Sequence, residues 1–308
     1  MPHRIALLLS LIISPCAQSA TKPAAPLSHT YDQMLSEFAN RSMSTSERYQ
    51  RLLTHYANAR MTIAKPAEAS IQDLHSAFSM GEAMLTAAHG YSAPNARRYV
   101  ADMAALFDEL ARRGGTTLEQ RNSMLGSYLS AWDFDAAKAL ATTETHIKPS
   151  RIGTFTQVGT IEASAPALVS FSEDGSARLA AYQFPKGPLL VVSAGCHIAR
   201  RAADAVAADP SLSAALKSID VLWLSPASSA LDPAAISEWN RRFPDAEMRV
   251  AYDNAKWPGV DFARLPSFHV FVDGKLVTTL NGWGDDKGAI NQLWKALATA
   301  GIERKPSN

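Results

Sequence analysis

The sequence predicts a two-part protein: an all-α N-terminal domain of helical hairpins followed by an α/β C-terminal domain. Up to about residue 146, apolar residues recur at helical spacing and two helix-capping patterns occur. From Pro149 onward, β-branched and aromatic residues alternate, and strand-like runs take turns with helix-like runs. A length of 308 residues fits two domains.

The predicted helical domain covers residues 28–146. Residues 44–47 (STSE) and 116–119 (TTLE) each have the capping-box pattern, and Gly114-Gly115 ends the helix before the second box. Apolar residues from Leu125 to Trp132 recur at helical spacing, and this segment resembles a tetratricopeptide helix pair. The full repeat consensus is not met, so membership in that repeat family stays open. Two interpretations remain: a domain that only buries its own core, or a groove for a partner peptide.

In the C-terminal half, strand patterns and helix patterns alternate. Residues 168–171 and 177–184 flank Asp174-Gly175, which is the pattern of a β-hairpin. A strand at 154–158 precedes this hairpin; after it come a strand at 189–193, a helix at 200–208, a strand at 219–224, a helix at 233–242, a hairpin of 268–272 and 276–280, and a helix at 290–300. Strand–helix–strand alternation implies parallel pairing and an α/β layer fold.

The first 20 residues have the pattern of a secretory signal peptide. Arg4 supplies the positive charge, Ile5–Ile13 form an apolar core too short to span a bilayer, and small residues follow. We therefore expect a periplasmic or secreted protein of a Gram-negative bacterium. Cys16 resembles the cysteine of a lipoprotein signal, but Pro15 before it makes lipidation the less favoured alternative.

Charge and cysteine content limit the kinds of partner and of disulfide that we expect. Lys and Arg total 30 against 29 for Asp and Glu, so we expect neither nucleic acid nor an anionic membrane surface as partner. Beyond the signal, no stretch is apolar and long enough for a membrane span. Once Cys16 is removed or lipidated, Cys196 is alone, so any disulfide must form with another molecule.

Cys196 has the sequence surroundings of a reactive thiol. The apolar run Leu189–Ser193 leads through Gly195 to the cysteine, and a helix-like stretch follows. Unpaired N–H groups at a helix N-terminus favour a thiolate, and His197 and Arg200 add positive charge nearby.

Residues 155–305 resemble the thioredoxin superfamily, and within it the TlpA-type branch of secreted proteins. The segments that carry the resemblance are Asp174-Gly175, Lys186-Gly187-Pro188, the strand–cysteine–helix unit around Cys196, and Leu265 to Gly274. The resemblance implies a thioredoxin-like domain in which Cys196 is the exposed nucleophile. It also implies that Pro266, preceded by Leu265, is the cis-proline beside the thiol.

The chain departs from the family at the active site, which is a degenerate CxxA. Ala199 stands where a dithiol oxidoreductase has its resolving cysteine, and Gly195 replaces the usual tryptophan. A monothiol can still attack a disulfide, but an external thiol such as glutathione must then release the mixed disulfide. The first hypothesis is therefore redox work on protein thiols or disulfides through Cys196, by mixed-disulfide exchange or thiol protection. Whether this amounts to enzymatic turnover stays open.

Two alternatives remain. One is a non-catalytic interaction module, in which the thioredoxin-like fold is a scaffold and the helical domain binds a peptide. The other is copper handling by Cys196, His197 and His269, because thiolate and imidazole suit copper. The second cysteine of copper-delivering relatives is absent, and we expect neither a metal nor another cofactor. The partner, the external reductant and the oligomeric state cannot be inferred from the sequence.

Overall fold

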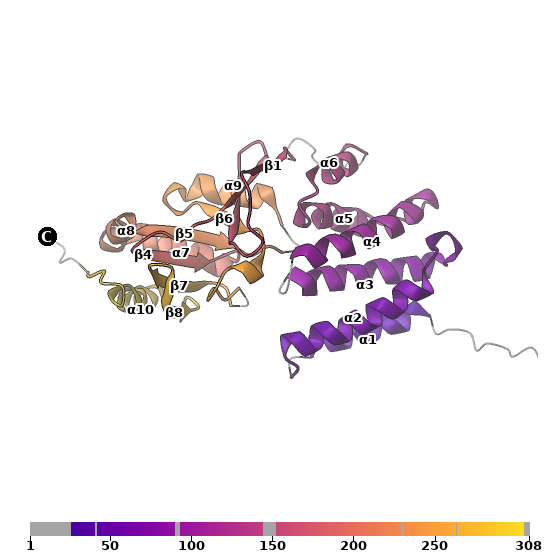
Figure 1. Cartoon of the computed structure of the whole chain (residues 1–308), viewed down its shortest axis with the longest axis horizontal. Helices are drawn as coiled ribbons and strands as arrows, with labels where there is room; N and C mark the ends of the chain where they lie inside the picture. The colour runs from indigo at the N-terminus through magenta and orange to yellow at the C-terminus, as the bar shows by residue number, and fades with distance from the viewer. Residues whose placement is uncertain are drawn as a thin grey trace, which may run out of the picture.

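The computed structural model describes residues 26–40, 42–89, 93–143, 152–228, 231–262 and 264–304. Figure 1 shows helices α1–α6 gathered on one side and a sheet with helices α7–α10 on the other. The predicted signal peptide and lipoprotein cysteine lie outside the described residues. Within the described ranges, no helix is long and apolar enough to cross a membrane.

The N-terminal part is helical throughout its described length. Its α-helices are α1 (Leu27–Ala39), α2 (Thr45–Thr62), α3 (Ile71–His89), α4 (Ala93–Arg112), α5 (Leu118–Ser130) and α6 (Phe134–Thr143), with a 3₁₀ turn, η1 (Pro66–Glu68), before α3. Successive helices pack on each other, and α3 also contacts α1 and α5. Their shared core contains Phe78, Met103 and Leu110. The helical prediction is therefore confirmed, while tetratricopeptide membership stays a prediction.

Two capping boxes begin α2 and α5. Ser44 accepts the backbone N–H of Glu47 and returns its own N–H to the Glu47 carboxylate, as predicted. The second box is formed by Thr117 and Gln120, one residue beyond the predicted 116–119. The prediction was wrong because two consecutive threonines offer two registers, and a glutamine fills the third position as well as a glutamate does.

The C-terminal part is built on one mixed sheet. Its strands are β1 (Phe155–Val158), β2 (Ala167–Phe171), β3 (Ala177–Ala181), β4 (Pro188–Ser193), β5 (Asp220–Ser225), β6 (Met248–Ala251), β7 (Ser267–Val272) and β8 (Lys275–Asn281). Its helices are α7 (His197–Ala208), α8 (Pro210–Lys217), α9 (Pro233–Arg242) and α10 (Asp286–Ala298), with 3₁₀ turns η3 (Pro244–Ala246) and η4 (Asn254–Lys256). The strand order in the described sheet is β1-β3-β2-β6-β5-β4-β7-β8.

The pairing of the four neighbouring strands β5, β4, β7 and β8 is the part of the sheet that tests the predicted fold class. β4 runs parallel to β5, while β7 pairs antiparallel with β4 on its other edge and β8 antiparallel with β7. This order is consistent with the predicted thioredoxin-like fold. The sequence did not predict β6, a four-residue strand whose apolar residues are separated by Arg249. It also did not predict α8, which follows α7 after the single residue Asp209.

The two faces of the sheet are covered by different elements. Leu190 and Val192 of β4 lie in the larger core, with residues of α7–α10. Val191, between them, lies in a smaller core with Phe271 and with Trp257 from the segment after β6. Successive strand residues point to opposite faces, so one strand supplies both cores.

Helices α5 and α6 join the larger core. The ring of Trp132 stacks 5.7 Å from the rings of both Phe155 and Tyr252, and the ring of Phe134 lies 5.5 Å from that of Phe155. Arg97 of α4 donates to the Tyr252 hydroxyl at 2.8 Å. The helical part therefore packs on the β1–β3 end of the sheet. The predicted domain limits, 28–146 and 155–305, stay a prediction.

The larger core should depend on Phe268, which is fully buried with its ring 5.3 Å from that of Trp283. Phe268→Ala should lower the free energy of unfolding by about 3–5 kcal/mol in urea denaturation, because it leaves a cavity between β7 and the helices. Val277→Thr, on the exposed side of β8, is the control and should change it by less than about 0.5 kcal/mol. Equal effects of the two substitutions would contradict this description of the core.

Candidate functional site

Strand β4 leads into Cys196, which lies at the N-terminus of α7. The Ala194 N–H donates to the Leu224 carbonyl at 2.9 Å, which continues the pairing with β5. Gly195 then turns the chain with φ at 139°. Cys196 is the N-cap of α7, and its carbonyl accepts the Ala199 N–H at 3.1 Å. The predicted strand–cysteine–helix unit is confirmed, with the helix beginning at His197 and not at 200.

Three segments meet at Gly195. A side chain at this position would lie 3.4 Å from the Ser225 Oγ, 3.7 Å from the Pro226 Cδ and 3.9 Å from the Leu265 Cδ1. A φ of 139° is also one that residues with a side chain rarely adopt. Glycine suits this position because the backbone has a conformation that disfavours a side chain.

The thiol of Cys196 lies at the boundary between core and solvent. Cys196 is half-buried, packs against the larger core and belongs to no disulfide within the described chain. Ala199 is fully buried one turn further on. His197 and Arg200 are exposed on the first turn of α7. The structure therefore places all four predicted residues on this turn, and their functional roles stay predictions.

Pro266 lies at the same end of the sheet. The Leu265–Pro266 peptide bond is cis, which confirms that sequence prediction. Pro266 is buried, Leu265 is half-buried, and β7 starts at the next residue. In the register of β7 with β4, Ser267 stands opposite Ser193. Leu265 and Pro266 are thereby brought next to the residues that lead into Cys196.

A buried polar network lies behind this end of the sheet. The Ser193 Oγ donates to the Asp261 carbonyl at 3.1 Å and lies 3.1 Å from the Ser267 Oγ. The Asp261 N–H donates to His269 Nε2 at 3.3 Å, and His269 Nδ1 lies 3.2 Å from the Thr279 Oγ1. Ser193, Ser267 and His269 are fully buried. The network ties the segment after β6 to β4, β7 and β8.

Sequence reasoning missed this network, although one signal was present. Ser193, Ser267 and His269 stand in strands that are otherwise apolar, and polar groups buried in strands need partners. Their partners lie on an irregular segment, whose position no periodic pattern predicts.

The alternative of a copper site made by Cys196, His197 and His269 does not fit the described geometry. His269 lies opposite Val191, which belongs to the smaller core, whereas Cys196 packs against the larger core on the other face. Both ring nitrogens of His269 already have partners, and burial lowers the pKa of His269. In the described part of the chain, no group of three or more His, Cys, Asp or Glu side chains could hold a metal ion.

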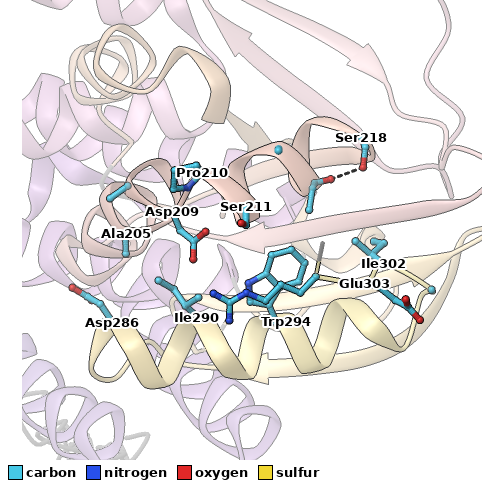
Figure 2. A pocket seen from close by; sticks show the side chains of 15 residues that line it. Ala205, Asp209, Pro210, Ser211, Ser218, Asp286, Ile290, Trp294, Ile302 and Glu303 are labelled. Atoms are coloured by element: carbon cyan, nitrogen blue, oxygen red, sulfur yellow. Dashed lines mark hydrogen bonds between the residues drawn. The ribbon is translucent and has the colours of Figure 1, made fainter. Parts of the chain in front are cut away.

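A separate cavity of about 1050 Å³ lies between α8 and α10, as Figure 2 shows. Its lining includes Ala205, Asp209 and Trp294, and the Arg304 guanidinium lies 5.9 Å from the centre of the Trp294 ring. Asp209 follows the last residue of α7, and the 12 residues of α7 span about 18 Å from the end that carries Cys196. The cavity is therefore distinct from the thiol site.

Comparison with known proteins finds little sequence similarity. No protein-family model and no curated protein matches the chain. The crystal structure of a thioredoxin-like protein from Bacteroides caccae ATCC 43185 aligns over 93% of this chain and 99% of that chain, at 13% sequence identity and a TM-score of 0.26. The strand order and the pairing of β5, β4, β7 and β8 are consistent with a thioredoxin-like fold in the C-terminal part.

The position of Ala199 can be tested by restoring a second thiol. Ala199→Cys should form an internal disulfide with Cys196 on oxidation, because residues three apart in the first turn meet the short separation that a disulfide needs. The measurement is the mass of the protein before and after oxidation and alkylation. Ala203→Cys is the matched control: it is also buried on α7 but lies about 10 Å along the helix and should leave two free thiols. Two free thiols in the Ala199→Cys variant as well would contradict the placement of Cys196 at the helix mouth.

Proposed function

We propose that the protein is a periplasmic, TlpA-type thioredoxin-like protein that acts in thiol–disulfide redox processes through the single thiol of Cys196. The observation that supports it most is the place of Cys196: half-exposed, at the N-terminus of α7, beside Gly195 and the Leu265–Pro266 bond. Catalytic roles for Cys196 and Pro266, with support from His197, Arg200 and Leu265, are part of the proposal. Periplasmic location follows from the predicted signal peptide alone.

The proposed chemistry is a one-thiol exchange. The Cys196 thiolate attacks one sulfur of a disulfide in a partner protein, that S–S bond breaks, and its electron pair leaves with the second sulfur. A mixed disulfide with Cys196 results. Ala199 has no thiol to resolve it, so an external thiolate such as glutathione attacks the Cys196 sulfur or the partner sulfur and completes the exchange. If the exchange stops at the mixed disulfide, the partner thiol is protected from further oxidation.

The surroundings of the thiol suit a protein partner. Gly195 is exposed and carries no side chain, so the surface beside the thiol is open where the family has a large ring. The exposed Arg200 places a positive charge on the same turn, which also carries the exposed His197. Positive charge near a thiol favours the reactive thiolate.

The alternative, a non-catalytic interaction module, is supported by a groove in the helical part. A cavity of about 610 Å³ between α2 and α4 is lined by residues that include Tyr56, Arg60, Met61 and Asp102. Met61 is 71% exposed, and Arg60 beside it pairs with Asp102 at 2.8 Å. An exposed methionine in a groove suits docking of an apolar peptide side chain.

Disulfide reduction assays separate the two functions. Mature protein should not reduce insulin in buffer without added thiol, and should do so when excess glutathione is added, because glutathione replaces the missing resolving thiol. Cys196→Ser should abolish the glutathione-dependent activity. Turnover without added thiol would contradict the one-thiol chemistry, and equal rates for the protein and Cys196→Ser would favour the interaction module.

A further inference from the structure

A cavity of about 530 Å³ lies where the helical part meets the sheet. Arg97 of α4 and Trp132, from the turn between α5 and α6, line it on the helical side. Leu179 of β3 and Lys256 of η4 line it on the side of the sheet. Its volume lies in the range of small-molecule pockets, and Cys196 is not among the residues that line it. The cavity is therefore separate from the thiol site.

The indole of Trp132 has a hydrogen-bond donor without an acceptor. Trp132 is 6% exposed, and its Nε1 has no hydrogen-bond partner within the described chain. A buried donor left without an acceptor is costly, and such groups in native proteins usually bond to something. Because Trp132 lines the cavity, the cavity is the space beside this indole in which an acceptor can lie.

The backbone holds Trp132 in a strained conformation. Its φ is 63°, in the left-handed region that bulky residues rarely adopt. The Trp132 N–H donates to the Leu129 carbonyl at 3.0 Å and the Asp133 N–H to the Tyr128 carbonyl at 2.9 Å. These are the two bonds of a Schellman motif, in which glycine is usual at the position of Trp132. Strained residues of this kind are concentrated at functional sites.

Two cations also line the cavity without a carboxylate partner. Arg97 donates to the Tyr252 hydroxyl at 2.8 Å, and within the described chain neither Arg97 nor Lys256 forms an ion pair. The Tyr252 hydroxyl accepts from Arg97, so its own proton is available to another acceptor. The polar groups of Arg97, Lys256, Tyr252 and Trp132 are thus all donors, which suits an anion.

Two carboxylates line the cavity as well, but they leave these donors unpaired. Asp253 is buried, and its Oδ1 accepts the Ala255 N–H at 3.0 Å as the cap of η4. Glu162 is exposed on the segment between β1 and β2, where water and salt screen its charge. The remaining wall is largely apolar and includes Ile161 and Leu179. An acidic head and an apolar body therefore fit this cavity together.

We propose that the cavity binds a small carboxylic acid with an apolar body, for which 3-phenylpropanoate is a suitable probe. The carboxylate accepts from Arg97 and from the Trp132 indole, Lys256 adds a second positive charge, and the apolar body lies against Ile161 and Leu179. The acid contacts the helical part and the sheet together. This binding does not depend on the chemistry of Cys196.

Titration calorimetry of the mature protein tests the proposed ligand class. The two probes are 3-phenylpropanoate and its neutral counterpart 3-phenylpropanamide. The acid should bind at least about tenfold more tightly than the amide, because hydrogen bonds to a charged group are the stronger ones. Equal dissociation constants for the two probes would overturn the proposal. Absence of binding of the acid up to about 10 mM would overturn it as well.

Substitution of Arg97 tests the place of the acid. Arg97→Gln should weaken binding of the acid about tenfold and leave binding of the amide unchanged, and Arg97→Lys, which keeps the charge, should weaken it less. Arg98→Gln is the matched control: Arg98 is the next residue of α4 and is also exposed, but it lines the cavity between α2 and α4. Equal weakening by Arg97→Gln and Arg98→Gln would indicate a general effect of charge and overturn the proposal.

The indole N–H resonances of the wild-type protein give a readout that needs no variant. The Trp132 indole N–H should shift when the protein is saturated with 3-phenylpropanoate. The Trp257 indole N–H, which is also buried without an acceptor but lies in the smaller core, is the control and should not shift. An unchanged Trp132 resonance under saturation would overturn the proposal. A shift of the Trp294 resonance alone would place the acid in the cavity between α8 and α10, and would overturn it too.

Discussion

The antiparallel pairing of β4 with β7 is the constraint on which the site depends. In its register Ser193 stands opposite Ser267 and Val191 opposite His269, so the two strands end together where Cys196 and Pro266 lie. A slip by one residue would turn each side chain to the other face of the sheet. It would move Phe268 out of the larger core and place His269 there. The hydrophobic pattern of β7 therefore determines that Leu265 and Pro266, which precede β7, lie next to the residues before Cys196.

Buried polar groups on these strands bond the segment between β6 and β7 to the sheet. Between β6 and β7 the described chain has no strand and only the short turn η4, so its backbone lacks the ladder of hydrogen bonds that strands have. Ser193 supplies a donor and His269 an acceptor to the backbone of Asp261 in place of that ladder. Such groups are costly to bury without partners, and here each one is satisfied by the segment that it holds.

Much of the fold could be predicted from the sequence, because period and turn chemistry are local. The hairpin around Asp174-Gly175, the strand before Cys196 and the helix at 233–242 all follow from such patterns, and the parallel pairing of β4 with β5 follows from the helices between them. The missed β6 has four residues, one of them Arg249, which is too short a run to show alternation. The packing of α5 and α6 on the sheet, through Trp132, depends on contacts distant in sequence and could not be predicted. For the same reason the partners of His269 were unforeseen, while Cys196, Ala199 and Pro266 could be placed by motif.

The proposed function depends on Cys196 being made reactive by its place in the fold. The most direct measurement is the rate at which Cys196 exchanges with oxidised glutathione in the native protein and in the urea-unfolded chain at the same pH. A helix N-terminus and adjacent positive charge favour the thiolate only when the chain is folded. The proposed function predicts faster exchange in the native protein than in the unfolded chain. Slower exchange in the native protein than in the unfolded chain would contradict it and leave the fold as a scaffold.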